Sequence, residues 1–366
     1  MKRRIVETGV IAACLSAPAF PAEAVTGKYR MDFYGLMKIT SIYNSHGVAG
    51  DDYLAYVTSV DPKEGDFSMS ARATRLGLNV ADEEANAAAK IEIDFLGLTD
   101  SLSGTAGTSV SPRIRHAYMT YKTGDFSFLA GQTWQLTPFE LPDTNNDLYF
   151  AYAGALWARA PQLRATWSQS PDWNVSVAAV RPTRKLTDAE GTASKIPQAQ
   201  AQVQFKLGAA KITVGGALGQ WESTGTFLPG NVRLIDLGFS VPYGIFTLNG
   251  QIWTGENLYD FQGGIGNMGY DGQEVKASGG FADLKIKPWD YLYFNAACGI
   301  DHPESKYLAV NSKMKNSIVM ANVNYVLKKR ITLSFETSYM VTEYKTAEGS
   351  ENRGDQHYQF AITYPF

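Results

Sequence analysis

The feature that most constrains this chain is a ten-residue stretch in which polar and apolar side chains alternate without a break. It runs from Gln198 to Leu207 and reads QAQAQVQFKL. Successive side chains of a strand point to opposite sides, so the glutamines and Lys206 share one face, while the alanines, Val203, Phe205 and Leu207 share the other. About ten residues is also the length that a tilted strand needs to cross the core of a bilayer. The stretch therefore predicts a wall with lipid on one side and water on the other.

The same alternation recurs along the chain, and the predicted strands are joined by long and short connections in turn. Short turns such as 208–210 and 328–330 alternate with long polar stretches such as 44–66 and 343–355, and residues 67–80 are expected to form one strand. An antiparallel meander closed into a barrel places alternate connections at opposite ends. Pairing of the first and last strands then removes the sheet edges. We therefore predict an all-β fold, a transmembrane antiparallel β-barrel of about 16 strands.

The N-terminus predicts export. Three basic residues precede an apolar run from residue 10 to 20, and Ala22-Glu23-Ala24 follows, which is typical of a secretory signal peptide over residues 1–24. Its removal takes away three basic and two acidic residues, moves the formal charge from −3 to −4, and leaves Cys298 as the single cysteine. An intramolecular disulfide is then excluded. Residues 25–366 are expected to form a single barrel domain, and the mildly acidic charge argues against a nucleic-acid partner.

The last predicted strand, 357–366, ends on the C-terminal residue itself. Tyr358, Phe360, Ile362 and Tyr364 face the same way as Phe366. An apolar alternating strand with a terminal Phe resembles the insertion signal of bacterial outer-membrane proteins, which implies recognition of Phe366 by the barrel assembly machinery. The expected location is the bacterial outer membrane, with its lipid around the barrel. A soluble all-β domain with an incidentally aromatic end is the alternative.

The longest predicted connection, residues 135–160, combines acidic with aromatic side chains. It carries Glu140, Asp143 and Asp147, together with Tyr149 and Tyr152. So many aromatic side chains favour packing over exposure to solvent, so we expect an inward-folded loop that narrows a water-filled barrel. A loop that lies over the barrel mouth or at a subunit contact is the alternative.

Arginines on the early strands form the second set of candidate pore-lining residues, namely Arg72, Arg75, Arg113, Arg115 and Arg164. An arginine facing lipid at mid-depth costs about 2–4 kcal/mol, so these side chains should face the lumen. Opposite the loop acids they would create a field across the constriction, and guanidinium groups bind carboxylates in a bidentate way. The alternative is a structural role in ion pairs with Glu92, Asp94 and the loop acids. Strict alternation from Arg115 places His116 on the lipid side.

Other functions find little support in the residue pattern. The four histidines are dispersed, with no Ser or Asp partner at a spacing typical of a catalytic triad, so we predict no enzyme. An outer-membrane hydrolase of barrel fold and a closed structural barrel are the alternatives from other classes. A sugar-selective channel is a further alternative, because Trp134, Tyr149, Tyr152 and Trp157 could form a sliding surface. Residues 145–147 offer three oxygen-bearing side chains in a row, which is common in turns, so neither a metal nor a cofactor is predicted.

Three short motifs resemble those of a known family. They are RATRLG at 72–77, RIRHAY at 113–118 and AGQTW at 130–134 ahead of the long loop, and the terminal Phe366 accompanies them. With these features the chain resembles Gram-negative outer-membrane porins, and most of all the DcaP-like trimeric porins. The resemblance implies a homotrimer of sixteen-stranded barrels, a third loop that folds inward, and passive diffusion of small hydrophilic solutes with a preference for anionic ones such as carboxylates.

Overall fold

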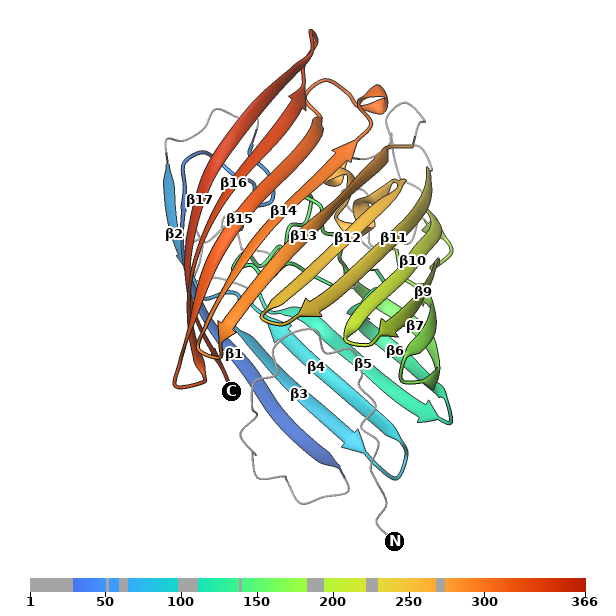
Figure 1. The fold of residues 1–366 in the computed structure, drawn as a ribbon. Coiled ribbons are helices and arrows are strands. Elements are labelled where there is room, and N and C mark those ends of the chain that lie inside the picture. The colour runs from blue at the N-terminus through green and yellow to red at the C-terminus, as the bar shows by residue number, and fades with distance from the viewer. Residues whose placement is uncertain are drawn as a thin grey trace.

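Antiparallel strands dominate the molecule (Figure 1). The computed structural model describes residues 29–50, 53–58, 65–97, 111–137, 140–182, 194–221, 230–267 and 274–366. The predicted signal peptide lies outside these residues. The strands are β1 Arg30–Asn44, β2 Asp66–Ser70, β3 Arg75–Asp82, β4 Ala87–Asp94, β5 Arg113–Thr123, β6 Phe126–Trp134, β7 Arg159–Ser170, β8 Trp173–Val180, β9 Gln198–Leu207, β10 Ala210–Trp221, β11 Gly230–Tyr243, β12 Phe246–Glu256, β13 Lys276–Trp289, β14 Leu292–Pro303, β15 Lys313–Leu327, β16 Ile331–Lys345 and β17 Ser350–Pro365. Among the described residues, three short 3₁₀ helices accompany them: η2 Leu258–Phe261, η3 Gly264–Gly266 and η4 Ser305–Tyr307.

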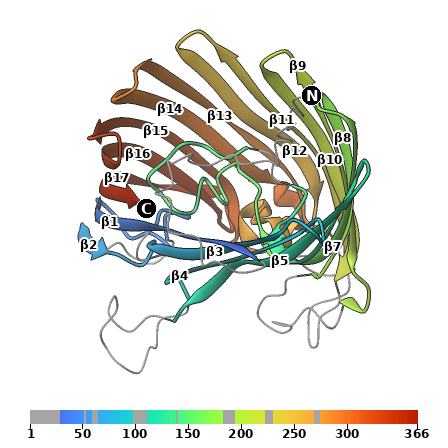
Figure 2. The ribbon, with the colours of Figure 1, turned by 90° about the horizontal axis from the view of Figure 1, so that it is seen from below.

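The sheet closes on itself. Neighbouring strands pair in chain order, and β1 pairs antiparallel with β17 from Leu36↔Pro365 to Asn44↔His357. Figure 2 shows the closed ring. Because β2 and β3 both pair with β1, they occupy one strand position, and the ring has sixteen positions. The predicted barrel and its strand number are confirmed. No helix among the described residues is long and apolar enough to cross a membrane.

The two faces of the wall differ as the alternation predicts. The glutamines of β9 are between 1% and 5% exposed, whereas Phe205 and Leu207 on the opposite face are 43% and 64% exposed. Along β1, Phe33, Met37 and Ile39 are likewise exposed. The polar face is thus turned to the barrel interior and the apolar face to the outside, which is the arrangement that a bilayer requires.

The predicted strand 67–80 is interrupted in the structure. Residues 71–74 turn between β2 and β3, and the backbone N–H of Thr74 donates to the carbonyl of Ala71 (3.0 Å). The Thr74 hydroxyl replaces part of the missing ladder, since it lies 3.3 Å from the backbone nitrogen of Lys38 and 3.4 Å from its carbonyl oxygen. The alternation of polar and apolar residues does not reveal this break, because the hydroxyl of Thr74 takes the place of a backbone group as the hydrogen-bond partner of Lys38.

The predicted long loop at 343–355 is also wrong. The strands β16 and β17 continue through it and pair up to Lys345↔Ser350, so only residues 346–349 connect them. The segment is polar on both faces, which suggested a loop. The backbone hydrogen bonds between two strands do not require an apolar face, so the hairpin of β16 and β17 continues through this polar segment (Figure 1).

Candidate functional site

The connection between β6 and β7 contacts polar side chains of the wall. Phe150, Ala153 and Leu156 are fully buried. The Leu156 N–H donates to the side-chain oxygen of Gln251 on β12 (3.0 Å), and Asn316 on β15 donates to the Tyr152 carbonyl (2.8 Å). This connection therefore touches strands far from its own in the sequence.

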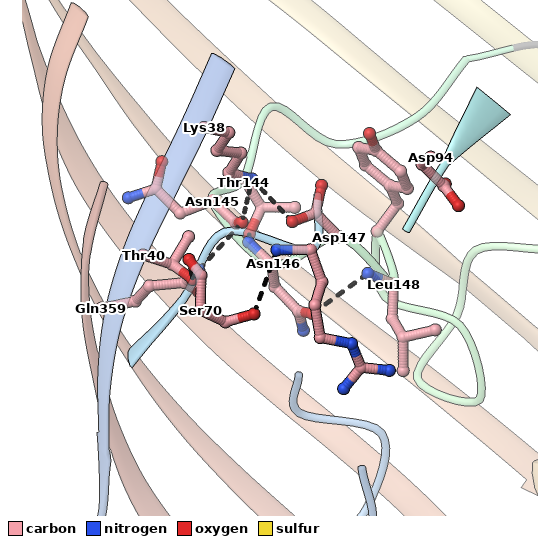
Figure 3. A network of polar contacts seen from close by, with 12 residues as sticks. Lys38, Thr40, Ser70, Asp94, Thr144, Asn145, Asn146, Asp147, Leu148 and Gln359 are labelled. Carbon is pink, nitrogen blue, oxygen red and sulfur yellow. Dashed lines mark hydrogen bonds and ion pairs between the residues drawn. The ribbon is translucent and has the colours of Figure 1, made fainter. Parts of the chain in front are cut away.

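Residues 144–147 are fixed by side chains from β1, β16 and β17 (Figure 3). Lys38 donates to the Asn145 carbonyl (2.8 Å), and Gln359 donates to the same oxygen (3.1 Å). The Asn145 N–H and the Thr144 hydroxyl donate to the two carboxylate oxygens of Glu336 (2.6 and 2.7 Å). Buried backbone polar groups of this turn thus find partners on the wall, which fixes its position.

Close packing at one point of this connection depends on glycines. Gly154 has φ +121°, and a Cβ at that position would overlap the carbonyl oxygen of Gly280. A Cβ at Gly299 on β14 would lie 2.2 Å from the carbonyl oxygen of Ala153. Only glycine permits this approach of backbone to backbone. Tyr152, nearby, is flanked by Tyr56 at a ring-centroid distance of 6.3 Å, and burial raises the pKa of the Tyr152 phenol well above its usual value.

Each of the three predicted loop acids forms an ion pair with a lysine of the wall. The pairs are Glu140 with Lys211 on β10 (2.5 Å), Asp143 with Lys285 on β13 (2.6 Å) and Asp147 with Lys38 on β1 (2.8 Å). Sequence reasoning missed these lysines, although all three lie in predicted strands. The acids accordingly attach the connection to three sides of the wall, and their charges are matched locally.

Two of the predicted arginines are neutralised by carboxylates on the neighbouring strand β4. Arg113 binds both oxygens of Asp94 (3.0 and 2.7 Å), and Arg115 contacts Glu92 (2.6 Å) and Asp94 (2.9 Å). Asp94 and Arg115 are buried. This is the structural role that the sequence left as an alternative, and it agrees with the preference of guanidinium for bidentate carboxylate contacts.

The other three predicted arginines have different partners. Arg75 donates to the Tyr149 hydroxyl (2.8 Å) and lies 3.6 Å from Asp147. Arg72, in the turn between β2 and β3, points to the carbonyl oxygens of residues 95 and 97. Arg164 donates to the side-chain oxygen of Gln162 (2.8 Å) and to the backbone carbonyl of residue 134 (2.6 Å). The structure thus groups five of the ten predicted site residues, namely Arg75, Arg113, Arg115, Asp147 and Tyr149. The other five have separate surroundings; they are Arg72, Glu140, Asp143, Tyr152 and Arg164.

Arg159, at the start of β7, belongs to this group and was missed. Its guanidinium carbon lies 4.4 Å from the ring centroid of Trp134 and 5.3 Å from that of Trp157, and Arg113 and Arg115 are within electrostatic range. The only signal in the sequence was its position between the aromatic connection and the strand that carries Arg164. Residue 159 falls within the predicted loop 135–160, whereas β7 begins there in the structure.

His116 is on the interior side, contrary to the prediction from strict alternation. It is buried and its Nδ1 lies 2.9 Å from the Thr133 hydroxyl. The register of β4 against β5 shifts between Glu92 and Ile93, so that Arg115 and His116 are both buried, while Ile114 and Met119 are both exposed. A β-bulge of this kind turns one side chain to the other face, which a fixed period cannot predict.

Metal binding finds no support in the described part of the chain. No group of three or more His, Cys, Asp or Glu side chains is arranged there to hold an ion. Among residues 145–147, the Asp147 carboxylate is taken by Lys38, and the Asn146 side chain donates to the Leu54 carbonyl (3.0 Å). The row of oxygen-bearing side chains therefore has structural partners.

Comparisons with solved structures place the fold. No family model matches the sequence, and no curated protein matches it. The outer membrane channel DcaP of Acinetobacter baumannii superposes with a TM-score of 0.78 at 18% identity, over 95% of this chain and 99% of that one. An anion-selective porin from Comamonas acidovorans gives 0.63 at 14% identity, over 92% and 100%, and OprB of Pseudomonas putida gives 0.62 at 11%, over 92% and 94%. The resemblance expected from the motifs is confirmed at the level of the fold, and this chain has the sixteen-stranded barrel fold of the outer-membrane porins.

Proposed function

We propose that this chain is an outer-membrane porin, a passive diffusion channel for small hydrophilic solutes that favours anions such as carboxylates. Residues 1–24 would direct export as a signal peptide, and residues 25–366 would form the barrel. The fold shared with outer-membrane porins supports the channel and its location, as does the contrast between an apolar outer and a polar inner face.

The observation that carries the anion preference is an excess of basic side chains in the ion pairs of three carboxylates, Glu92, Asp94 and Asp147. Five bases share these carboxylates, namely Lys38, Arg75, Lys90, Arg113 and Arg115. Paired charges largely cancel, so the two unmatched positive charges determine the sign of the local field. A low-dielectric wall focuses such a field into the water-filled space and favours anions.

The connection 135–160 is proposed as the constriction loop, with Glu140, Asp143, Asp147, Tyr149 and Tyr152 on it and the five predicted arginines on the facing wall. Its contacts with β1, β12, β15, β16 and β17 support this role, because strands far apart in the ring hold its backbone. An outer membrane protein of Vibrio cholerae with this fold is described in a trimer form, and we propose a homotrimer here too. Phe366 would serve in recognition by the barrel assembly machinery.

Reconstitution in planar bilayers tests the proposal. A KCl gradient should give a reversal potential with the sign of chloride permeation. Channels that conduct potassium in preference to chloride would contradict the anion preference, and a folded protein without conductance would contradict the channel itself.

A further inference from the structure

We propose that Arg159 is the residue that binds the solute's carboxylate, and that Arg113 and Arg115 serve the architecture of the site. This inference rests on the proposed porin function and assigns its selectivity to one side chain. It differs from the expectation from sequence, which placed the binding role on the arginines of β5.

The guanidinium of Arg159 is unlike the others because protein acceptors do not satisfy it. Its Nη1 is enclosed and has no hydrogen-bond partner, and Nε and Nη2 form no hydrogen bond with the described part of the chain. Within the described part of the chain, no carboxylate lies at ion-pair distance from it. A half-buried cation without an acceptor is costly unless something binds it, so its retention suggests that a mobile anion supplies the missing partner.

The aromatic side chains around Arg159 hold it in place. The indoles of Trp134 and Trp157 meet edge to face, with ring centroids 5.7 Å apart, and both contact the guanidinium. Trp157 is fixed in turn by its Nε1, which donates to the Leu148 carbonyl (2.7 Å). Aromatic faces attract the cation without neutralising it, and they exclude water from one side. The charge therefore stays available on the side that remains open.

The neighbouring arginines strengthen this assignment. Arg113 and Arg115 share two carboxylates with Lys90, and Arg164 donates to two oxygen acceptors. Arg113, Arg115 and their partner Asp94 all lie within electrostatic range of Arg159, and the paired charges largely cancel, so the unpaired positive charge there is that of Arg159. A planar oxyanion on Nε and Nη2 of Arg159 would form the two parallel hydrogen bonds typical of guanidinium and carboxylate. The ligand class is thus a small solute that carries a carboxylate.

The experiment compares acetate with acetamide, its uncharged counterpart of similar shape, in swelling of proteoliposomes. The variants are Arg159→Gln, Arg159→Lys and the double variant Arg113→Gln/Asp94→Asn, which removes a charge pair without changing net charge. Removal of one charge about 4 Å from the solute in water corresponds to about a fivefold change. We expect Arg159→Gln to lower the acetate/acetamide rate ratio about fivefold. The double variant should keep the parental ratio.

Arg159→Lys separates the effect of charge from that of geometry, and it tests the proposal even if the glutamine variant does not fold. It keeps the positive charge but lacks the two parallel N–H donors of the guanidinium. The chloride/potassium permeability ratio should therefore stay parental, while the preference for acetate over chloride falls. Parental acetate selectivity in both Arg159 variants, or its loss in the double variant, would overturn the assignment. If the parent protein itself shows no preference for acetate, then the proposed anion preference fails as well, which is a different result.

Discussion

Gly299 on β14 offers a direct test of how the connection 135–160 sits in the barrel. A Cβ at this position would lie 2.2 Å from the carbonyl oxygen of Ala153 and 3.1 Å from a ring carbon of Phe150. Atoms of this kind normally stay about 3.5 Å apart, so Gly299→Ala requires a shift of about 1 Å by the loop or by the strand. The ladder fixes β14 between β13 and β15, so we expect the loop to move, away from the wall and toward the lumen.

The expected result is a lower single-channel conductance and a stability loss of roughly 1–3 kcal/mol, as is typical of overpacking. Conductance in planar bilayers and thermal unfolding followed by circular dichroism measure the two effects. Ala296→Val is the matched control, because its side chain is on the exposed face of the same strand. If Gly299→Ala matched the parent in both measurements, the loop would not be in contact with this wall, and the proposed constriction would lose its support.

Three further predictions address the ion pairs and the two faces of the wall. Arg115→Gln should destabilise the barrel by about 3 kcal/mol in denaturant unfolding, at the low end for a broken buried ion pair, because Arg113 stays on Asp94 and Lys90 stays near Glu92. Arg233→Gln breaks a pair with a 60% exposed arginine side chain and should cost at most about 1 kcal/mol, so equal effects would contradict this difference. Lys38→Met removes the ammonium that binds the Asn145 carbonyl and the Asp147 carboxylate of the loop, and it should increase current fluctuations in single-channel records. Fluctuations no larger than those of the parent would show that the lysine is dispensable. Cys298 is exposed on the outer face, so in membranes it should react with an apolar maleimide and resist a charged, membrane-impermeant one, while rapid reaction with the charged reagent would contradict the assignment of faces.

The wall was predictable from sequence because it follows from local periodicity. The strand β9 has the bounds 198–207 that the sequence predicts, and the glycine pair 279–280 lies within β13, paired with Trp253 and Ile252 on β12. Alternation needs only that one face meets lipid and the other meets water, and each strand carries that information in its own residues. The strands that were predicted too short, such as β17, extend beyond the region where this contrast applies.

The site was only partly predictable because its geometry depends on departures from that period. The bulge near Glu92 moves His116 to the interior, and the turn at 71–74 places Arg72 against the carbonyl oxygens of residues 95 and 97. Neither feature leaves a signal in the spacing of apolar residues. The lysines that bind the loop acids lie in predicted strands, but which lysine pairs with which acid depends on where the connection 135–160 lies against the wall. A long-range pairing of this kind, with Lys285 and Asp143 separated by 142 positions, is not encoded in any short stretch.

Arginine content alone is therefore a poor guide to the selectivity of such a wall. A guanidinium that binds two carboxylate oxygens, as Arg113 does, fixes two strands together but contributes little to the field that a solute meets. One that lies between indoles, as Arg159 does, keeps its charge and leaves hydrogen-bond donors open. The two kinds look alike in the sequence and differ only in whether a carboxylate lies on the adjacent strand in register. Selectivity in this fold should thus follow the arginines that lack acidic partners, and exchange of Asp94 for asparagine should convert Arg113 from the first kind into the second and raise the chloride/potassium permeability ratio.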